Sequence, residues 1–169
     1  MIPDLASMLD DILRREGGFV NHEADRGGPT NHGITQATLA AWRQHPVTVD
    51  EVRSLTEAEA RAIYLGRYLT EPKLDRIHDP YVLSLAFDSA VNHGPQRVIR
   101  WLQKIVGVVD DGILGPRSEV AINSYEPVRL YQRLLARRIT FYGEIISRDH
   151  SQSVFALGWL RRAAEFVEV

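Results

Sequence analysis

Apolar residues recur at three- and four-residue steps along most of the chain, the spacing that places side chains on one face of a helix. The first stripe runs from Leu5 to Leu13 and is followed by the pair Gly17-Gly18, so we expect a helix that ends at Glu16. Strand-like alternation of apolar and polar residues is almost absent. The pattern predicts a mainly α fold, with short helices over about 35–42 and from residue 116, and longer ones over about 56–69, 80–93, 95–106, 127–148 and 154–167.

One segment, residues 17–33, breaks this periodicity. It holds five glycines and Pro29, and we expect it to form a loop or a small irregular hairpin. The chain carries no internal repeat and no linker-like run of Ser, Gly and Pro, so a domain boundary near residues 72–80 would be a packed junction. We therefore expect residues 1–79 and 80–169 to form two regions of one compact body.

Composition narrows the classes of partner. The 20 Lys and Arg residues against 22 Asp and Glu give a net charge of −2, which lacks the basic field of nucleic-acid-binding proteins. The absence of cysteine excludes disulfides and thiolate metal sites. No stretch approaches the roughly 18 apolar residues of a membrane-spanning helix, and Asp4, Asp10 and Asp11 stand where a secretory signal would be basic. We expect a monomer with no cofactor, membrane insertion, signal segment or nucleic-acid partner.

Three polar residues in and beside the glycine-rich segment form a candidate catalytic set: Glu16, Asp25 and Thr30. Glycoside hydrolysis needs a carboxylic acid that protonates the leaving oxygen, and a second group that activates water or stabilises positive charge on the sugar. Partial desolvation at a cleft wall favours the neutral form of a carboxyl group, whereas a carboxylate on a solvated loop stays ionised. Two such environments would separate the roles of Glu16 and Asp25.

Motifs along nearly the whole chain resemble those of one family. The runs Glu16-Gly17-Gly18-Phe19 and Asp25–Thr35 are similar to the signature of glycoside hydrolase family 108, the N-acetylmuramidases found in phage endolysins and secretion-activator-type proteins. Residues 88–94, 102–103 and 111–116 are similar to the peptidoglycan-binding half that accompanies this family, and 155–162 resembles its closing motif. Four motifs in the right order are more specific than any one alone.

The resemblance implies a lysozyme-like helical fold, with a muramidase region over 1–79 and a helical peptidoglycan-binding-like region over 80–169. It implies hydrolysis of the β-1,4 bond between N-acetylmuramic acid and N-acetylglucosamine in peptidoglycan, with lysis of the cell, and Glu16 as the catalytic acid. The spacing of Glu16, Asp25 and Thr30 is also close to the Glu-Asp-Thr order of phage lysozymes, with a threonine gap one residue shorter. The side chains expected to hold the glycan strand are those of Asn31, His32, Asp88 and Asn92.

Departures from the family pattern leave alternatives open around the glycine-rich segment. Phe19 stands where tyrosine is usual, and His22-Glu23 replaces a more usual Asp-Pro, so Glu23 is a rival second carboxylate. Asp25 could instead cap the following glycine turn, and Thr30 could simply bond loop backbone.

Structural interpretations compete for the downstream candidates as well. Asp88 and Asn92, four residues apart on one helix face, could cap backbone groups instead of lining a cleft. Phe155 and Trp159 fall on an apolar stripe, and we expect them in the core rather than as a sugar platform. The arginines at 133, 137 and 138 are expected on a solvated helix face.

Other activities remain open at this point. A lytic transglycosylase would use one acid and the muramoyl 6-hydroxyl in place of water, and Asp25 argues mildly against it. A wall-binding or secretion-activating protein would not cut at all. A metal held by His22, Glu23, Asp25 and His32 is not expected, because metal-ligand spacing on a defined element is not evident. We expect synthesis in a host cytoplasm and release to the cell wall through a phage-made hole.

Overall fold

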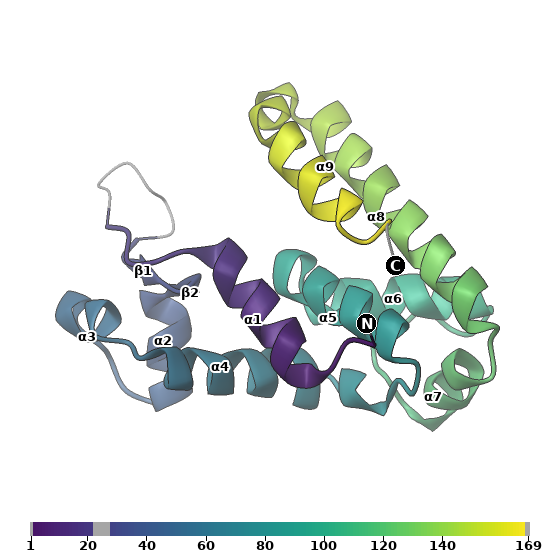
Figure 1. The fold of residues 1–169 in the computed structure, drawn as a ribbon, viewed down its shortest axis with the longest axis horizontal. Coiled ribbons are helices and arrows are strands. Elements are labelled where there is room, and N and C mark those ends of the chain that lie inside the picture. Colours follow the sequence, from purple (N-terminus) through teal and green to yellow (C-terminus); the bar gives the residue numbers. More distant parts are fainter. Residues whose placement is uncertain (1, 22–27, 168–169) are drawn as a thin grey trace. The chain divides into compact units, whose positions relative to one another are not determined.

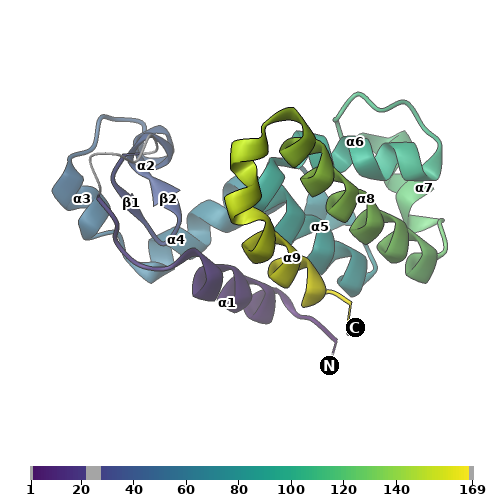
Figure 2. The ribbon, with the colours of Figure 1, turned by 90° about the horizontal axis from the view of Figure 1, so that it is seen from above.

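The computed structural model describes residues 2–21 and 28–167 of the chain. Its contacts divide the chain into two compact units. The first unit is Asp4–Arg67, and the second unit is Tyr68–Val169 together with the first three residues of the chain. This division falls between Arg67 and Tyr68, earlier than the expected boundary between residues 79 and 80, which stays a prediction. Helices dominate both units (Figures 1 and 2).

Short helices and a very small sheet build the first unit (Figure 1). The two strands pair antiparallel, with Thr30 opposite Thr35 and Asn31 opposite Ile34, and Val20 forms an isolated bridge with Thr30. The elements are α1 (Leu5–Glu16), β1 (Thr30–Asn31), β2 (Ile34–Thr35), α2 (Gln36–Arg43), α3 (Val49–Arg53) and α4 (Glu57–Tyr64).

Side-chain caps fix where these helices begin, because they satisfy amide groups that have no partner within the first turn. Asp4 accepts a hydrogen bond from the Ser7 amide at 2.8 Å and starts α1. Thr35 and Thr56 accept at 3.2 Å and start α2 and α4. The apolar face of each helix then turns inward, and the core of the unit includes Met8, Leu9, Ile12, Leu13, Ile34, Leu39, Val52, Ala60 and Ile63.

The chain does not leave its helical path after α4. A π-helical segment, η1 (Leu65–Thr70), continues it across the division between the units. Gly66 lies against the Trp42 ring, where an added Cβ would come within 2.8 Å of a ring carbon. The expected helix over 56–69 thus had nearly the right span, whereas its change of winding was not predicted.

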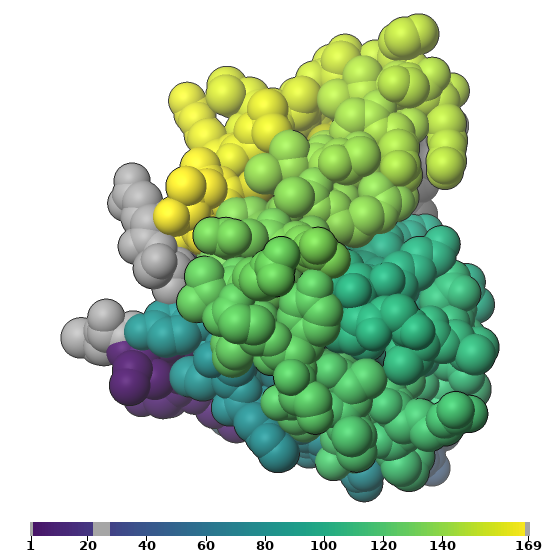
Figure 3. Space-filling model, turned by 90° about the vertical axis from the view of Figure 1, so that its right-hand side faces the viewer, coloured from purple at the N-terminus to yellow at the C-terminus, as the bar shows by residue number. Residues whose placement is uncertain are grey.

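Longer helices build the second unit. The central helices α5, α6 and α8 pack on one another, and α9 packs on α8 (Figure 2). In the space-filling view, the teal atoms of α6 and the green atoms of α8 form adjoining parts of the surface of this unit (Figure 3). The elements are η2 (Leu74–Arg76), α5 (Pro80–His93), α6 (Pro95–Val106), α7 (Pro116–Asn123), α8 (Pro127–Arg148), η3 (His150–Phe155) and α9 (Ala156–Ala164).

Proline and glycine set most helix ends in this unit. A proline occupies the first positions of α5, α6, α7 and α8, where its missing amide hydrogen costs nothing. Gly94 and Gly107 follow α5 and α6 with positive φ angles of 82° and 78°, a conformation that glycine adopts without steric cost. The apolar run in α5 is buried, including Leu85, Phe87 and Ala90, as its sequence predicts.

The predicted mainly α fold is confirmed, and the glycine-rich segment contains the strand β1, which pairs with β2 directly after the segment. Some details differ. Helix α3 was not predicted, although Thr48 and Glu51 form a capping box at its start. The helix expected over 154–167 is divided into η3 and α9.

Two expectations about burial in the second unit were wrong. Phe155 is 53% exposed instead of lying in the core, because the 3-10 segment η3 ends the helical stripe on which it was placed. Arg138 is completely buried, not solvated, because Asp88 on α5 pairs with it. Among the described residues, no helix combines the length and the apolar character needed to cross a membrane.

Candidate active site

Glu16 is the last residue of α1, where the helix gives way to two glycines. The buried stripe of α1 includes Ile12 and Leu13, and Glu16 lies one helical turn further on, so its side chain continues the same face. The residue is half-buried. The carboxyl group of Glu16 therefore lies where the apolar stripe of α1 meets solvent, and it is neither buried in the core nor fully exposed.

The backbone of Gly33 lies against both the Glu16 side chain and the Tyr64 hydroxyl. A Cβ added to Gly33 would lie 2.5 Å from Tyr64 Oη, 2.8 Å from Glu16 Cβ and 2.9 Å from Glu16 Oε2. Real Cβ atoms do not make such contacts, so no other residue fits at this position without a shift. Gly33 also has a φ of 73°, which favours glycine. The turn between β1 and β2 thus packs its bare backbone directly against Glu16 and Tyr64.

Tyr64 ties this turn to α4. Its hydroxyl donates a hydrogen bond of 2.8 Å to the carbonyl oxygen of His32, while its ring is buried. His32 has a φ of 49°, an uncommon conformation for a residue with a side chain. Because the hydroxyl fixes the backbone next to Gly33, we regard Tyr64 as a positioning residue for Glu16.

A cleft of about 400 Å³ runs beside this arrangement. Glu16 is not one of its lining residues, but Gly17 follows Glu16 directly, and His32 precedes the glycine that Glu16 touches. His32, predicted to bind substrate, is therefore placed at the cleft. The residues that line the cleft are Asp10, Leu13, Arg14, Gly17, Gly18, His32, Glu57 and Arg61.

The carboxylates that line this cleft are already paired with a cation. Arg61 Nη2 lies 2.8 Å from Glu57 Oε1 and also pairs with Asp10. These hydrogen bonds, first that of Asp10 and then that of Glu57, raise the pKa of the Arg61 guanidinium. Asp10 and Glu57 are therefore both held by the Arg61 guanidinium.

Thr30 and Asn31 bond to the backbone in the structure. The Thr30 hydroxyl donates to the Gly28 carbonyl at 3.0 Å, which was the structural alternative for this residue. Asn31 is only 5% exposed, and its amide nitrogen donates to the carbonyl oxygens of Val52 and Arg53, both at 3.0 Å. Asn31 thus caps the end of α3. The structure favours this role over the predicted substrate contact, which stays a prediction, as does water activation by Thr30.

The proposed partner of Glu16 cannot be placed. Asp25 lies outside the described residues, together with its rival Glu23 and with His22. Its role as second carboxylate therefore stays a prediction. Within the described ranges, no three His, Asp or Glu side chains are arranged to hold a metal ion.

Asp88 and Asn92 lie in the second unit, on α5. Asp88 is 3% exposed, and its carboxylate meets Arg138 Nη1 at 2.7 Å and Arg162 Nη2 at 2.9 Å. Asn92 donates to the Asp88 carbonyl at 2.6 Å. A carboxylate enclosed by two guanidinium groups has a structural role, so the predicted substrate contact of Asp88 is not supported by its surroundings. For Asn92, which is exposed, the contact stays a prediction.

Sequence reasoning missed Tyr64, Gly33 and the full burial of Arg138. Tyr64 falls on the apolar stripe of α4 with Ala60 and Ile63, so nothing local distinguishes its hydroxyl from that of any core tyrosine. Gly33 was recognised only as a turn former. Its closeness to Glu16 links residues 17 positions apart, and only the folded chain shows it.

These features define a class of protein: a helical glycosidase-like unit, with a carboxylate beside a cleft, followed by a second helical unit. The glycosyl hydrolase 108 family profile matches residues 9–94, and a profile described as a predicted peptidoglycan domain matches residues 97–164. The chain belongs to the glycosyl hydrolase 108 family. Its function is therefore related to peptidoglycan.

A solved structure supports the same assignment. The structure of Brucella abortus SagA is similar to this chain, with 33% sequence identity and a TM-score of 0.82, over 96% of this chain and 90% of that chain. The comparison with curated proteins finds no match. The predicted lysozyme-like helical fold and the predicted family are both confirmed.

Proposed function

We propose that the protein hydrolyses the β-1,4 bond between N-acetylmuramic acid and N-acetylglucosamine in peptidoglycan, with Glu16 as the general acid. The observation that carries this proposal is the half-buried Glu16 side chain, packed against Gly33 beside the cleft. Membership of a glycosyl hydrolase family supports the class of reaction. The match to a peptidoglycan domain supports the choice of polymer.

In the proposed reaction, the Glu16 carboxyl group donates its proton to the glycosidic oxygen while the bond between that oxygen and the anomeric carbon breaks. Water adds to the anomeric carbon, and its proton passes to a second base. Glu16 then recovers a proton from solvent. The turn at Gly33 serves this step, since an acid held in one position needs less reorganisation to reach the transition state.

For the second base we propose Asp25, helped by Thr30. The Thr30 hydroxyl donates its hydrogen bond to the Gly28 carbonyl oxygen. Its own oxygen can still accept a hydrogen bond from a water molecule. Glu23 is the rival carboxylate, and the variants Asp25→Asn and Glu23→Gln separate the two. The variant that loses hydrolysis while keeping wall binding identifies the base.

The central test is the variant Glu16→Gln, which keeps the shape of the side chain but has no acidic proton. We expect clearing of a peptidoglycan suspension to slow by about 10²–10⁴-fold, the usual contribution of general acid catalysis. Sedimentation with insoluble walls should be unchanged. Glu71→Gln is the matched control, because Glu71 is exposed, lies outside the cleft and should keep full activity. Undiminished clearing by Glu16→Gln would refute the assignment.

Mass spectrometry of the digest distinguishes the reaction from its rivals. New reducing-end muramic acid is the expected product of hydrolysis. Ends with 1,6-anhydromuramic acid would instead show a lytic transglycosylase, in which the muramoyl 6-hydroxyl replaces water. No new ends, together with retained sedimentation on walls, would show a protein that binds peptidoglycan without cutting it.

A further inference from the structure

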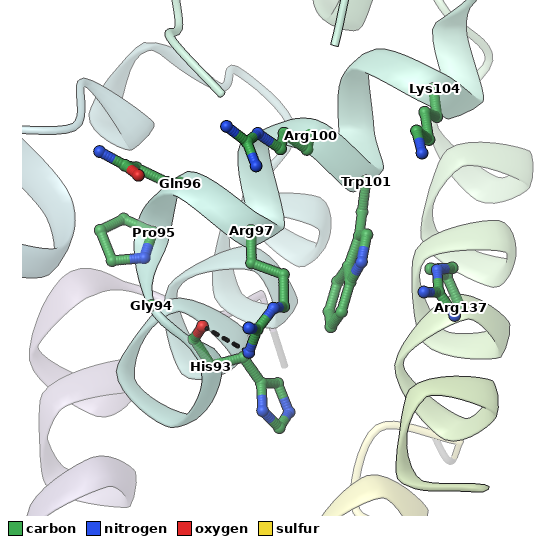
Figure 4. A pocket seen from close by; sticks show the side chains of 9 residues that line it. All are labelled: His93, Gly94, Pro95, Gln96, Arg97, Arg100, Trp101, Lys104 and Arg137. Atoms are coloured by element: carbon green, nitrogen blue, oxygen red, sulfur yellow. Dashed lines mark hydrogen bonds between the residues drawn. The ribbon is translucent and has the colours of Figure 1, made fainter. Parts of the chain in front are cut away.

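A second pocket lies within the second unit, between α6 and α8 at the end of α5. Its volume is about 540 Å³, within the usual range for small-ligand sites. Figure 4 shows Gln96, Arg97, Arg100, Trp101 and Lys104 along α6, with Arg137 facing them from α8. None of these groups belongs to the proposed hydrolytic site.

The lining of this pocket has charge of one sign only. Arg97, Arg100 and Lys104 stand three and four positions apart and so share one face of α6, and Arg137 adds a fourth cation. No Asp or Glu is among the lining residues. In a protein whose net charge is −2, four cations gather around one hollow, and those without a carboxylate partner of their own can attract an anion.

Two of the four cations already have carboxylate partners, and two do not. Lys104 Nζ lies 3.2 Å from Asp110 Oδ2, and Arg137 Nη1 lies 2.9 Å from Glu144 Oε1. Within the part of the chain that the structure describes, Arg97 and Arg100 form no ion pair with a carboxylate. Asp111 is the carboxylate that acts on Arg100: its pKa is lowered mainly by hydrogen bonds with Ile113 and Gln103, and in a smaller part by the Arg100 charge. These two guanidinium groups are therefore available to an anionic ligand.

Both available guanidinium groups are held in place by their neighbours. Arg97 donates to the His93 carbonyl at 3.3 Å (Figure 4), and its guanidinium lies 4.6 Å from the centre of the Phe141 ring. Arg100 crosses the backbone of Gly112, where an added Cβ would meet its Nε at 3.0 Å. Groups that are ordered before binding lose less entropy when a ligand arrives.

The start of α6 adds to the positive field. Pro95 opens the helix and Gly94 precedes it, so no side chain caps its first amide groups, and these carry partial positive charge. His93 stays neutral here, since burial and then the charges of Arg138 and Arg97 lower its pKa to about 3. Near pH 7, His93 therefore adds no charge to the lining of the pocket.

We propose that this pocket binds a carboxylate of the peptide stem of peptidoglycan, with Arg97 and Arg100 as its ligands. Guanidinium groups match carboxylates through paired, parallel hydrogen bonds. All four cations fall within residues 97–164, the match to the peptidoglycan domain. A single pocket of this size does not suit nucleic acid, which needs an extended basic stripe. This inference rests on the proposed function in one respect, which is the identification of peptidoglycan as the polymer that the protein binds.

Calorimetric titration of the full chain tests the pocket without any cutting. The probe is a soluble muramyl tetrapeptide with free carboxylates, which contains no β-1,4 bond between two sugars. We expect saturable binding that weakens with added salt and is lost when the carboxylates of the peptide are amidated. The double variant Arg97→Gln/Arg100→Gln should weaken binding by roughly tenfold or more. Arg129→Gln, an exposed arginine of α8 outside the pocket, should bind as the wild type does.

The outcomes separate this proposal from the hydrolytic one. Unchanged affinity of the double variant, or equal affinity for the amidated peptide, would overturn the carboxylate pocket. Tighter binding of polyphosphate or of a DNA oligonucleotide than of the peptide would overturn it as well. Glu16→Gln should bind the tetrapeptide normally, so loss of lysis with retained binding reports on the hydrolytic site alone. Unfolding curves show whether the double variant is folded. If it is not, the single variant Arg100→Gln tests the pocket in its place and should also weaken binding.

Discussion

Each unit holds a carboxylate near its core, but the surroundings of the two carboxylates differ. In the first unit, Glu16 is half-buried beside a cleft and packs against the backbone of Gly33. In the second unit, Asp88 is 3% exposed and is enclosed by Arg138 and Arg162. Both acids lie on helices and both fall in family motifs, so sequence position alone does not separate their roles.

The difference shows how surroundings decide whether an acid is structural or chemical. A buried carboxylate with two guanidinium partners is fully compensated, and removing it leaves uncompensated positive charge. A carboxylate beside a cleft, packed against backbone, keeps a face for a substrate, which is the setting in which catalytic acids are found. We therefore expect changes at Asp88 to affect folding first, and changes around Glu16 to affect activity first.

The largest expected effect on stability comes from Asp88→Asn. The substitution leaves Arg138, which is completely buried, and Arg162 without their carboxylate. Breaking a buried pair in this way costs about 3–5 kcal/mol, so urea unfolding should shift by this amount or the protein should fail to fold. Solubility and far-UV circular dichroism would report the second outcome.

Asp110→Asn is the control for this change. Asp110 pairs with Lys104 at the surface, with both side chains largely exposed, and such pairs contribute about 0–1 kcal/mol. If Asp88→Asn kept the stability of the wild type but lost its sedimentation with walls, Asp88 would be a substrate residue, as the sequence predicted, and the contrast between the units would fail.

Gly33→Ala should give the next largest effect, and mainly on activity. Alanine at a φ of 73° costs on the order of 1–2 kcal/mol, and its Cβ would press on Glu16 and Tyr64 Oη. The acid must then move from its position beside the cleft. We expect clearing of peptidoglycan to fall by about tenfold or more, since small displacements of catalytic groups reduce rates strongly.

Gly143→Ala in α8 is the matched glycine variant. An added Cβ meets nothing within 4 Å there, and alanine favours a helix over glycine by roughly 1 kcal/mol. This control should be slightly more stable and fully active. Normal lysis by Gly33→Ala would show that the turn does not position Glu16.

The same contrast explains how much could be predicted from sequence. Helix ends marked by local signals, such as Thr35, Thr56, Pro80 and Gly94, lie where they were predicted, because caps and backbone preferences act within a few residues. Glu16 likewise lies at the helix end where it was predicted, whereas its catalytic role stays a prediction.

Long-range partners could not be predicted in this way. Arg138 and Asp88 are 50 residues apart in the sequence, and no local pattern marks an arginine that will be buried opposite an aspartate. The turn at Gly33 meets Tyr64 from another helix. The basic pocket also needs α6 and α8 together, since Arg137 by itself has the features of an ordinary exposed arginine.

The smallest expected effect is the pH dependence due to His93. Burial, followed by the charges of Arg138 and Arg97, lowers its pKa from 6.5 to about 3 in the folded protein. Between these values the unfolded chain binds a proton that the folded one does not, so stability is complete above pH 6.5 and falls as the pH decreases. From pH 7 to pH 5 this group should cost about 1–2 kcal/mol, measured by urea unfolding at each pH.

His93→Phe isolates this contribution, because phenylalanine suits the aromatic surroundings of Trp101, Phe141 and Tyr142 but binds no proton. The variant should lose less stability than the wild type over the same pH interval, whatever its stability at pH 7. His45→Asn, at an exposed position, should keep the wild-type slope. Equal slopes for the wild type and His93→Phe would mean that His93 takes up its proton in the folded protein too. The second unit would then hold a protonated, half-buried histidine beside Arg138 and Arg97, and its difference from the first unit would narrow.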